Sequence, residues 1–291
     1  MPENRSNYPD AFGGSLKNDK NAEFTIVGVP FDDKSTYRKG SAEGPDKIRE
    51  VSTSDSINSY TESEIDLLSD TSVFDSGNIE FNNNFPEYFD LIERKVNEIA
   101  ENDSIPVLLG GDHSITYPAV KGISNKYEDL NLVWLDAHPD IYPKYDGDPY
   151  SHACPLARIL ELNKTDRIVQ AGIRATTREL DELLVKNKVE VIRCKDFCNV
   201  SGLKMEGPTY LTIDIDILDP AFAPGVGNPV PGGICTRKLI DVINSFEMDI
   251  IGFDIVEVNP GLDNSNITAM AAAKILMETI GRIVKLKNNS K

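Results

Sequence analysis

Residues 130–140 read LNLVWLDAHPD, an apolar run with one polar interruption that ends abruptly in charged residues. A similar run, IPVLL, occupies residues 105–109 and is followed by GGDHS. Such nearly continuous apolar runs are typical of parallel strands that are covered on both faces, whereas half-exposed antiparallel strands alternate apolar and polar residues. The two runs therefore predict a mainly parallel sheet that is buried between layers of helices.

Short β-rich runs alternate with helical periods along the rest of the chain. The predicted strands are 24–29, 104–109, 131–135, 167–171, 189–192, 209–213 and 249–253. Between them, Phe89, Ile92, Val96 and Ile99 recur at helical spacing. An Ala-rich helix is predicted over 267–286, with Asn266 as its N-cap. This alternation predicts an α/β fold, a three-layer α/β/α arrangement with a mainly parallel sheet.

Two segments are predicted to lie outside this regular pattern. Residues 1–22 are polar, and we expect a flexible N-terminal segment that precedes a single catalytic domain over 23–291. Residues 51–70 are rich in serine and acidic residues, which predicts an exposed connection with at most one short ordered turn.

The charge of the chain limits its partners. Its 291 residues include 47 acidic and 30 basic side chains, a formal net charge of −17. This excess argues against a nucleic-acid-binding surface, which is normally basic, and it attracts small cations. No apolar stretch approaches the roughly 18 residues of a membrane span, and the first residues lack the apolar part of a secretory signal. We expect a cytoplasmic protein with no nucleic-acid or membrane partner.

Polar residues gather directly after four of the predicted strands. Two of the groups, GGDHS (110–114) and DAHPD (136–140), contain two of the three histidines of the chain. The other two groups are DIDILDP (214–220) and DIVEVNP (254–260). Because ligands of parallel sheets bind outside the carboxyl ends of the strands, we expect the four groups to meet at one edge of the sheet.

The spacing of these groups predicts a metal centre. Alternate residues of DAHPD project to one side of an extended chain, and carboxylates on one side repel each other unless a cation lies between them. The candidate ligands are His113, Asp136, His138, Asp140, Asp214 and Asp216. Their four carboxylates balance two divalent ions, and oxygen and imidazole donors favour Mn(II) over a structural zinc. Two such ions that share a water lower its pKa to about 7 and provide a hydroxide.

With these motifs assembled, the sequence strongly resembles the ureohydrolase family, which includes arginases and agmatinases. The match runs from about Phe24 to Leu286. It starts with GVP (28–30) and RKGSAEGPDKIR (38–49) and continues through the metal motifs to EVNP (257–260). The resemblance implies the arginase/deacetylase-like fold, two Mn(II) ions per subunit, and hydrolysis of a guanidinium to urea and an amine. It also implies a homo-trimer or homo-hexamer.

The same resemblance implies a role for each site residue. One metal takes His113, Asp136, Asp140 and Asp214, and the other takes His138, Asp136, Asp214 and Asp216. Glu257 matches the acid that holds the guanidinium as a bidentate pair, and His152 matches the histidine that transfers a proton. Asp219 is interpreted as a residue that orients its loop and not as a ligand.

The identity of the guanidino substrate depends on residues at its other end. Asp146 and Asp148 are candidates to bind the bare ammonium of agmatine, whereas Lys144 is a candidate to bind a carboxylate. Residues 172–177 lack the acid that animal-type arginases place there, which favours agmatine, with putrescine and urea as products. DAHPD and YSHA also look like plant-type arginases, so arginine and other guanidino acids such as guanidinobutyrate stay open.

Two readings without this chemistry fit the sequence less well. A non-catalytic metal-binding relative is expected to lack a ligand or Glu257, and none is missing. A single-zinc deacetylase on the same fold would not need both His113 and Asp216.

Overall fold

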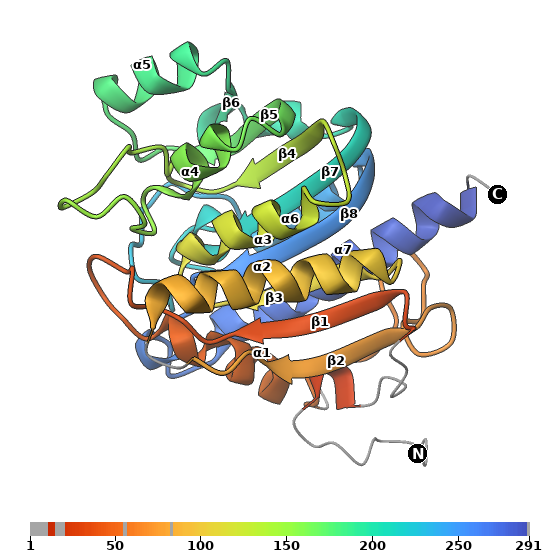
Figure 1. Cartoon of the computed structure of the whole chain (residues 1–291). Coiled ribbons are helices and arrows are strands. Elements are labelled where there is room, and N and C mark those ends of the chain that lie inside the picture. The colour runs from red at the N-terminus through yellow and green to blue at the C-terminus, as the bar shows by residue number, and fades with distance from the viewer. Residues whose placement is uncertain (1–10, 15–20, 55–56, 82–83, 290–291) are drawn as a thin grey trace.

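A computed structural model describes residues 11–14, 21–54, 57–81 and 84–289. Eight strands form one sheet in the order β2-β1-β3-β8-β7-β4-β5-β6, and all neighbouring strands pair in parallel (Figure 1). The strands are β1 (Phe24–Val29), β2 (Val73–Asn78), β3 (Ile105–Gly110), β4 (Leu130–Leu135), β5 (Thr165–Ile173), β6 (Glu190–Arg193), β7 (Lys204–Asp214) and β8 (Glu247–Val256). The predicted parallel sheet is confirmed; β2 was not predicted.

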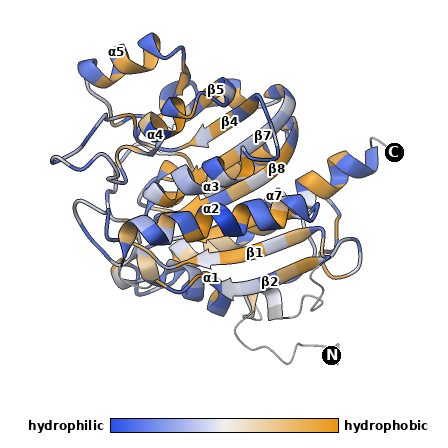
Figure 2. Cartoon of the chain, in the orientation of Figure 1, coloured by the Kyte–Doolittle hydropathy of each residue, from blue (hydrophilic) through white to orange (hydrophobic). Residues whose placement is uncertain are grey.

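Helices cover both faces of the sheet and complete three layers. They are α1 (Gly44–Ser52), α2 (Phe85–Glu101), α3 (Thr116–Ile123), α4 (Pro155–Glu161), α5 (Arg178–Lys186), α6 (Thr236–Ile243) and α7 (Ile267–Asn289). In Figure 1, α2 and α3 lie in front of the strands, and α7 lies behind them. The strands consist largely of hydrophobic residues, whereas the helices mix hydrophobic and hydrophilic ones (Figure 2). Successive residues of β3 point to opposite faces, so Val107 and Leu108 belong to two separate hydrophobic cores.

The long C-terminal helix α7 packs close to the sheet because its inner face carries small residues. Ala272 and Ala273 are fully buried there. The carboxylate of Asp263 accepts a hydrogen bond from the main-chain N–H of Thr268 at 2.7 Å and so satisfies the first turn. The predicted cap, Asn266, instead has a left-handed φ of 58°. The predicted start of the helix at residue 267 is confirmed, whereas the capping carboxylate comes from Asp263 and not from Asn266.

Two segments that were predicted to be loose contain packed residues. Phe12 is buried, and its N–H donates to Asp75 at 2.8 Å; residues 1–10 and 15–20 lie outside the described residues. Within 51–70, Ile65 and Leu67 belong to a hydrophobic core, and Glu62 N–H donates to the carboxylate of Glu278 on α7. Residues 55–56 also lie outside the described part. The expected exposed connection is therefore a segment that packs against α7.

No helix in the described ranges has the length and apolar character that a bilayer span requires.

Candidate metal centre and active site

The six candidate ligands follow three strands in the middle of the sheet. They are His113 after β3, Asp136, His138 and Asp140 after β4, and Asp214 and Asp216 at the end of β7. Strand β8 lies between β3 and β7, and Glu257 follows its last residue. Because all these strands run in parallel, their carboxyl ends bring the predicted residues to one edge, as the sequence predicted.

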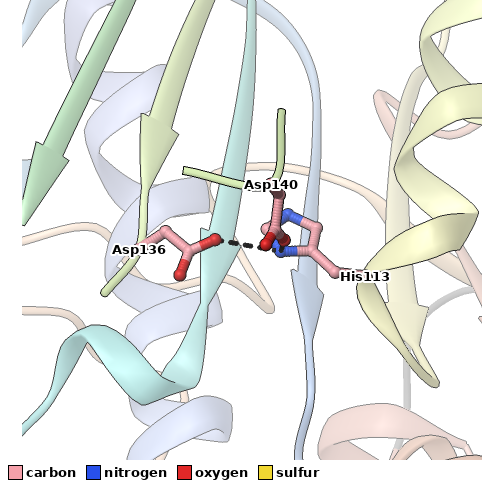
Figure 3. A group of neighbouring side chains, drawn as sticks. All are labelled: His113, Asp136 and Asp140. Carbon is pink, nitrogen blue, oxygen red and sulfur yellow. Dashed lines mark ion pairs between the residues drawn. The ribbon is translucent and has the colours of Figure 1, made fainter. Parts of the chain in front are cut away.

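The first group of ligands surrounds the ring of His113. Its Nδ1 lies 3.1 Å from Oδ2 of Asp136 and 3.1 Å from Oδ2 of Asp140 (Figure 3). It also lies 3.2 Å from Oδ2 of Asp214. Nδ1 is buried and has no hydrogen-bond partner among the residues that the structure describes. The arrangement is a nitrogen donor that faces three carboxylate oxygens, which is a donor set for a divalent cation.

The tautomer of His113 follows from its other nitrogen. Nε2 lies 3.0 Å from the hydroxyl of Thr212, and that hydroxyl donates its own proton to the buried carboxylate of Asp254. Nε2 must therefore carry a hydrogen and donate it to Thr212. In the neutral ring this leaves the lone pair on Nδ1, the nitrogen that faces the carboxylates.

The second group shares Asp136 with the first. Nδ1 of His138 lies 2.9 Å from Oδ2 of Asp216 and 3.6 Å from Oδ1 of Asp136. Asp136 thus faces one group with each of its oxygens, and the two groups are His113, Asp136, Asp140 and Asp136, His138, Asp216. Asp214 points Oδ2 at His113 and accepts the N–H of Asp216 on Oδ1, so its role as a second bridge stays a prediction.

The charges at this edge favour a cation. Burial, and secondly repulsion by the carboxylate of Asp136, raise the pKa of Asp140 to about 6. Burial and the neighbouring Asp216 and Asp136 raise the pKa of Asp214 well above its ordinary value. Burial acts to lower the pKa of His113, but the carboxylates around it outweigh burial and raise that pKa. The free carboxylates therefore repel one another, and the donors present fit two hard divalent ions such as Mn(II).

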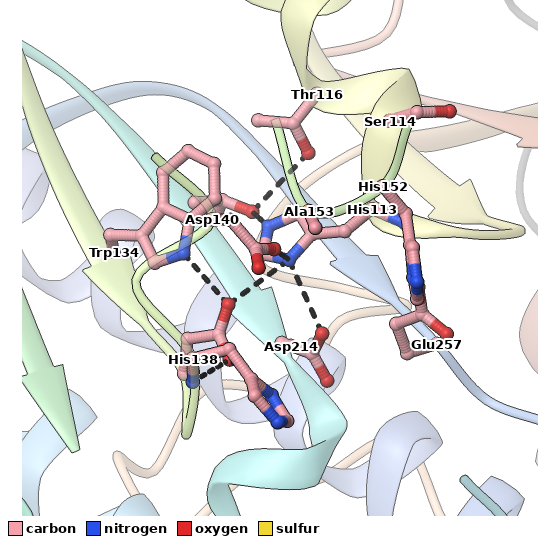
Figure 4. Close-up of polar contacts among 12 residues, drawn as sticks. His113, Ser114, Thr116, Trp134, His138, Asp140, His152, Ala153, Asp214 and Glu257 are labelled. Atoms are coloured by element: carbon pink, nitrogen blue, oxygen red, sulfur yellow. Dashed lines mark hydrogen bonds and ion pairs between the residues drawn. The ribbon is translucent and has the colours of Figure 1, made fainter. Parts of the chain in front are cut away.

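Buried polar contacts behind the ligands hold them in place. Asp254 accepts hydrogen bonds from Thr116 at 2.9 Å and Tyr210 at 2.8 Å, besides the one from Thr212. The indole of Trp134 donates to Oδ2 of Asp136 at 2.8 Å (Figure 4), and its ring stacks on His113. Partners of this kind orient metal ligands and set their basicity.

Glu257 and His152 meet beside the first group. Oε1 of Glu257 accepts the main-chain N–H of His113 at 2.9 Å and lies 2.8 Å from Nδ1 of His152 (Figure 4). Burial acts to lower the pKa of His152, but Glu257 outweighs burial and raises it to about 9. Glu257 has a left-handed φ of 66°, and Asp140 has one of 47°. Backbone strain of this kind clusters at functional sites.

A cavity of about 790 Å³ leads from these residues to the surface. Its lining includes Asp140, Asp214 and Asp216 together with His152 and Glu257. The part of the lining that we call the outer wall consists of Tyr37, Arg38, Tyr142, Tyr145, Thr176 and Thr177. The outer wall is therefore aromatic and hydroxylated, with one arginine.

The acids predicted to bind an ammonium do not line this cavity. Neither Asp146 nor Asp148 belongs to its walls, and neither does Lys144. The carboxylate of Asp148 pairs with Lys34 at 2.7 Å and accepts the N–H of Tyr150 at 2.8 Å. The assignment of Asp146 and Asp148 as substrate-binding residues therefore stays a prediction, and the pairing of Asp148 with Lys34 does not support it.

Arg174 connects two walls of the site and was not predicted. Its guanidinium donates to the main-chain carbonyls of Asp216 at 2.6 Å, of Ile217 and Leu218 at 3.1 Å each, and of Val230 at 2.9 Å. It thereby joins the loop that carries a metal ligand to a segment that lines the cavity. The available signal was an arginine directly after the apolar strand β5. The predicted loop role of Asp219 agrees with its hydrogen bonds from three main-chain N–H groups.

We expect Arg174→Ala to lower the free energy of unfolding of the metal-free protein by about 2–4 kcal/mol, because it leaves several carbonyls without partners. Urea denaturation measures this change. Arg178→Ala removes an arginine from the exposed start of α5 and is the matched control, with an expected change within about 0.5 kcal/mol. Equal effects of the two substitutions would contradict the role of Arg174.

The chain is similar to known proteins over nearly its whole length. The family model described as the Arginase family matches residues 22–281. "Arginase, mitochondrial" of Medicago truncatula is 35% identical over 280 residues, 91% of this chain and 83% of that protein. "Agmatinase" of Bacillus subtilis (strain 168) is 35% identical over 272 residues, 91% of this chain and 93% of that protein. The crystal structure of agmatine ureohydrolase of Thermoplasma volcanium has a TM-score of 0.83 at 34% identity and covers 95% of each chain.

Proposed function

Because the chain belongs to the arginase family, whose hydrolases act on guanidino compounds, we propose that it hydrolyses agmatine to putrescine and urea with two Mn(II) ions. The observation that carries the proposal is the shared position of Asp136 between two histidine–carboxylate groups. Glu257 and His152 open onto the same cavity. When bound to these groups, two Mn(II) ions supply Lewis acidity and a water of lowered pKa.

Glu257 supplies the negative charge that a guanidinium needs. Its Oε1 already receives the hydrogen bonds of His113 and His152, which leaves Oε2 for the substrate. We therefore infer one charge-assisted hydrogen bond on Oε2 in place of the bidentate pair predicted from the resemblance. This contact fixes the cation beside the metal groups.

His152 supplies the proton that the leaving amine needs. Free Glu257 stabilises the imidazolium, as the raised pKa of His152 shows. A guanidinium bound to Glu257 neutralises that carboxylate, so the imidazolium loses support and becomes a stronger acid. Substrate binding thereby prepares His152 to give up its proton at the step where the amine departs.

The outer wall supports agmatine as the substrate. The segment after β5 contributes Ala175, Thr176 and Thr177 to the cavity, and none of them carries a charge that would bind an amino-acid end. Tyr142 and Tyr145 stand on the same wall, and aromatic faces attract alkyl ammonium groups.

Arginine is the second candidate, and Arg38 favours it. Arg38 lines the cavity and donates from Nε to the carbonyl of Gly227 at 2.9 Å. No ion pair joins it to a carboxylate within residues 11–14, 21–54, 57–81 and 84–289. A substrate carboxylate would complement its charge.

A panel of guanidino compounds decides between the two candidates. We expect kcat/KM for agmatine to exceed that for arginine, guanidinobutyrate and guanidine by at least about 10²-fold. A substrate that lacks the matching polar group, or carries a different one, leaves buried polar groups of the site without a partner, which costs binding free energy. Urea release from the Mn-loaded protein is the measurement. A preference for arginine or guanidinobutyrate would support the second candidate, and no urea from any compound would contradict both. Assembly as a trimer or hexamer and a cytoplasmic location stay predictions.

A further inference from the structure

The ring of His152 has a second set of contacts, opposite Glu257, on the loop that follows β1. Nε2 of His152 lies 2.9 Å from the hydroxyl of Thr36 and accepts the main-chain N–H of Thr36 at 3.2 Å. Thr36 itself lines the cavity. It therefore contacts one nitrogen of the buried histidine and also faces the space that substrate and water enter.

The two nitrogens of His152 have different tasks. Nδ1 faces the carboxylate of Glu257, which is an acceptor only, so Nδ1 carries a hydrogen in the neutral ring and in the imidazolium alike. The proton that comes and goes is consequently the one on Nε2. In the neutral ring the main-chain N–H of Thr36 donates to Nε2, and in the imidazolium the Thr36 hydroxyl accepts from Nε2–H.

The main chain holds Thr36 at this place from both sides. The carboxylate of Asp112 accepts the N–H of Lys34 at 3.0 Å. The amide of Asn259, in the EVNP motif, donates to the carbonyl of Lys39 at 2.9 Å. Asp112 and Asn259 are themselves buried beside the site. The position of Thr36 next to His152 is thus fixed by hydrogen bonds with Asp112, which follows β3, and with Asn259, which follows β8.

We propose that Thr36 is a positioning residue for proton transfer by His152. Thr36 provides Nε2 of His152 with a hydrogen-bond partner in both protonation states, and its hydroxyl passes the Nε2 proton to and from the cavity. A proton that leaves Nε2 is taken by the Thr36 hydroxyl oxygen while the hydroxyl gives its own proton to a cavity water or the leaving amine, so that no net charge stays on Thr36. The inference rests on the proposed ureohydrolase function, in which His152 protonates the amine.

Thr36→Val tests the proposal because it keeps the branched shape and the main-chain N–H and removes only the hydroxyl. The imidazolium then loses its acceptor, whereas Glu257, Asp112 and Asp140, the charged groups that act on His152, stay in place. We expect kcat to fall about 10-fold and the basic limb of the kcat–pH profile to move down by about one pH unit. Mn content and KM are expected to stay within about twofold.

Two further variants separate this role from a structural one. Thr36→Ser retains the hydroxyl and is expected to restore kcat and the pH limb. Thr36→Val in a His152→Ala background is expected to have no further effect, because the partner of the hydroxyl is gone. Any of four results would overturn the proposal. They are an unshifted basic limb of the kcat–pH profile in Thr36→Val, failure of Thr36→Ser to restore kcat and the limb, an equal loss of kcat when Thr36→Val is added to His152→Ala, and loss of Mn from Thr36→Val.

Nuclear magnetic resonance gives a readout that does not require urea production. The chain has only three histidines, so ¹⁵N-histidine labelling of the full chain loaded with diamagnetic Zn²⁺ yields few ring signals, and His152→Ala identifies the one of interest. We expect Nδ1 to stay protonated while Nε2 titrates, with a lower midpoint in Thr36→Val. An unchanged midpoint would overturn the inference about Thr36, whereas absence of urea from the wild-type protein with a shifted midpoint would refute only the proposed function.

Discussion

Asp136→Ala is expected to abolish tight binding of both Mn(II) ions. Asp136 faces His113 with one oxygen and His138 with the other, so its removal takes a donor from each group. We expect the rate of urea release to fall by at least about 10³-fold. This exceeds the 10–100-fold loss of activity that is typical when a residue that only hydrogen-bonds to a metal ligand is substituted. Metal analysis after gel filtration, together with urea release, measures both effects.

Asp216→Ala is the matched comparison, because Asp216 belongs to the His138 group alone. It is expected to keep the ion held by His113, Asp136 and Asp140. If Asp136→Ala retains one tightly bound ion, Asp136 is a ligand of a single metal and the shared position has another cause.

Glu257→Gln is expected to leave both ions bound and to lower kcat/KM for the preferred substrate by at least about 10²-fold. The amide oxygen can still accept from the N–H of His113, so the local shape is retained. The negative charge is lost, and a cation that approaches two metal ions is no longer attracted. Because Glu257 raises the pKa of His152, that pKa is also expected to fall, which moves the basic limb of the profile to lower pH.

Asp146→Asn is the control for this charge change. It removes an acid that lies close in sequence to His152 but outside the cavity walls, at a left-handed φ of 48° that asparagine tolerates. We expect kcat/KM within about twofold of wild type. Near-normal urea release by Glu257→Gln would show that Glu257 is structural and that another group holds the guanidinium.

The buried strands β3 and β4 were predictable because each is a nearly continuous apolar run. Strand β2 was not, since VFDSGN has the same length but is largely polar, and it pairs only with β1 at the end of the sheet. The burial of Ile65 and Leu67 depends on α7, which lies far away in the sequence. Local composition carries no information on such a contact.

The metal groups were predictable for a similar reason, because each ligand stands directly at a strand end within a charged motif. The helper residues differ. Thr36 lies in a loop without a recognisable motif, and only the fold brings it to His152. Asp148 looked available in the sequence, and its pairing with Lys34 was hidden by the distance between them along the chain. Residues that act through tertiary contacts therefore need the structure.

The placement of the ligands on three separate strand ends also has a thermodynamic consequence. An unfolded chain cannot hold the ends of β3, β4 and β7 together, so it has little affinity for the pair of ions that the folded sheet would bind. Binding to the folded state alone adds about 2.7 kcal/mol to the free energy of unfolding when free Mn(II) is 100 times its dissociation constant. With the proposed pair of Mn(II) ions, the folding equilibrium of the central sheet is expected to depend on the surrounding manganese concentration.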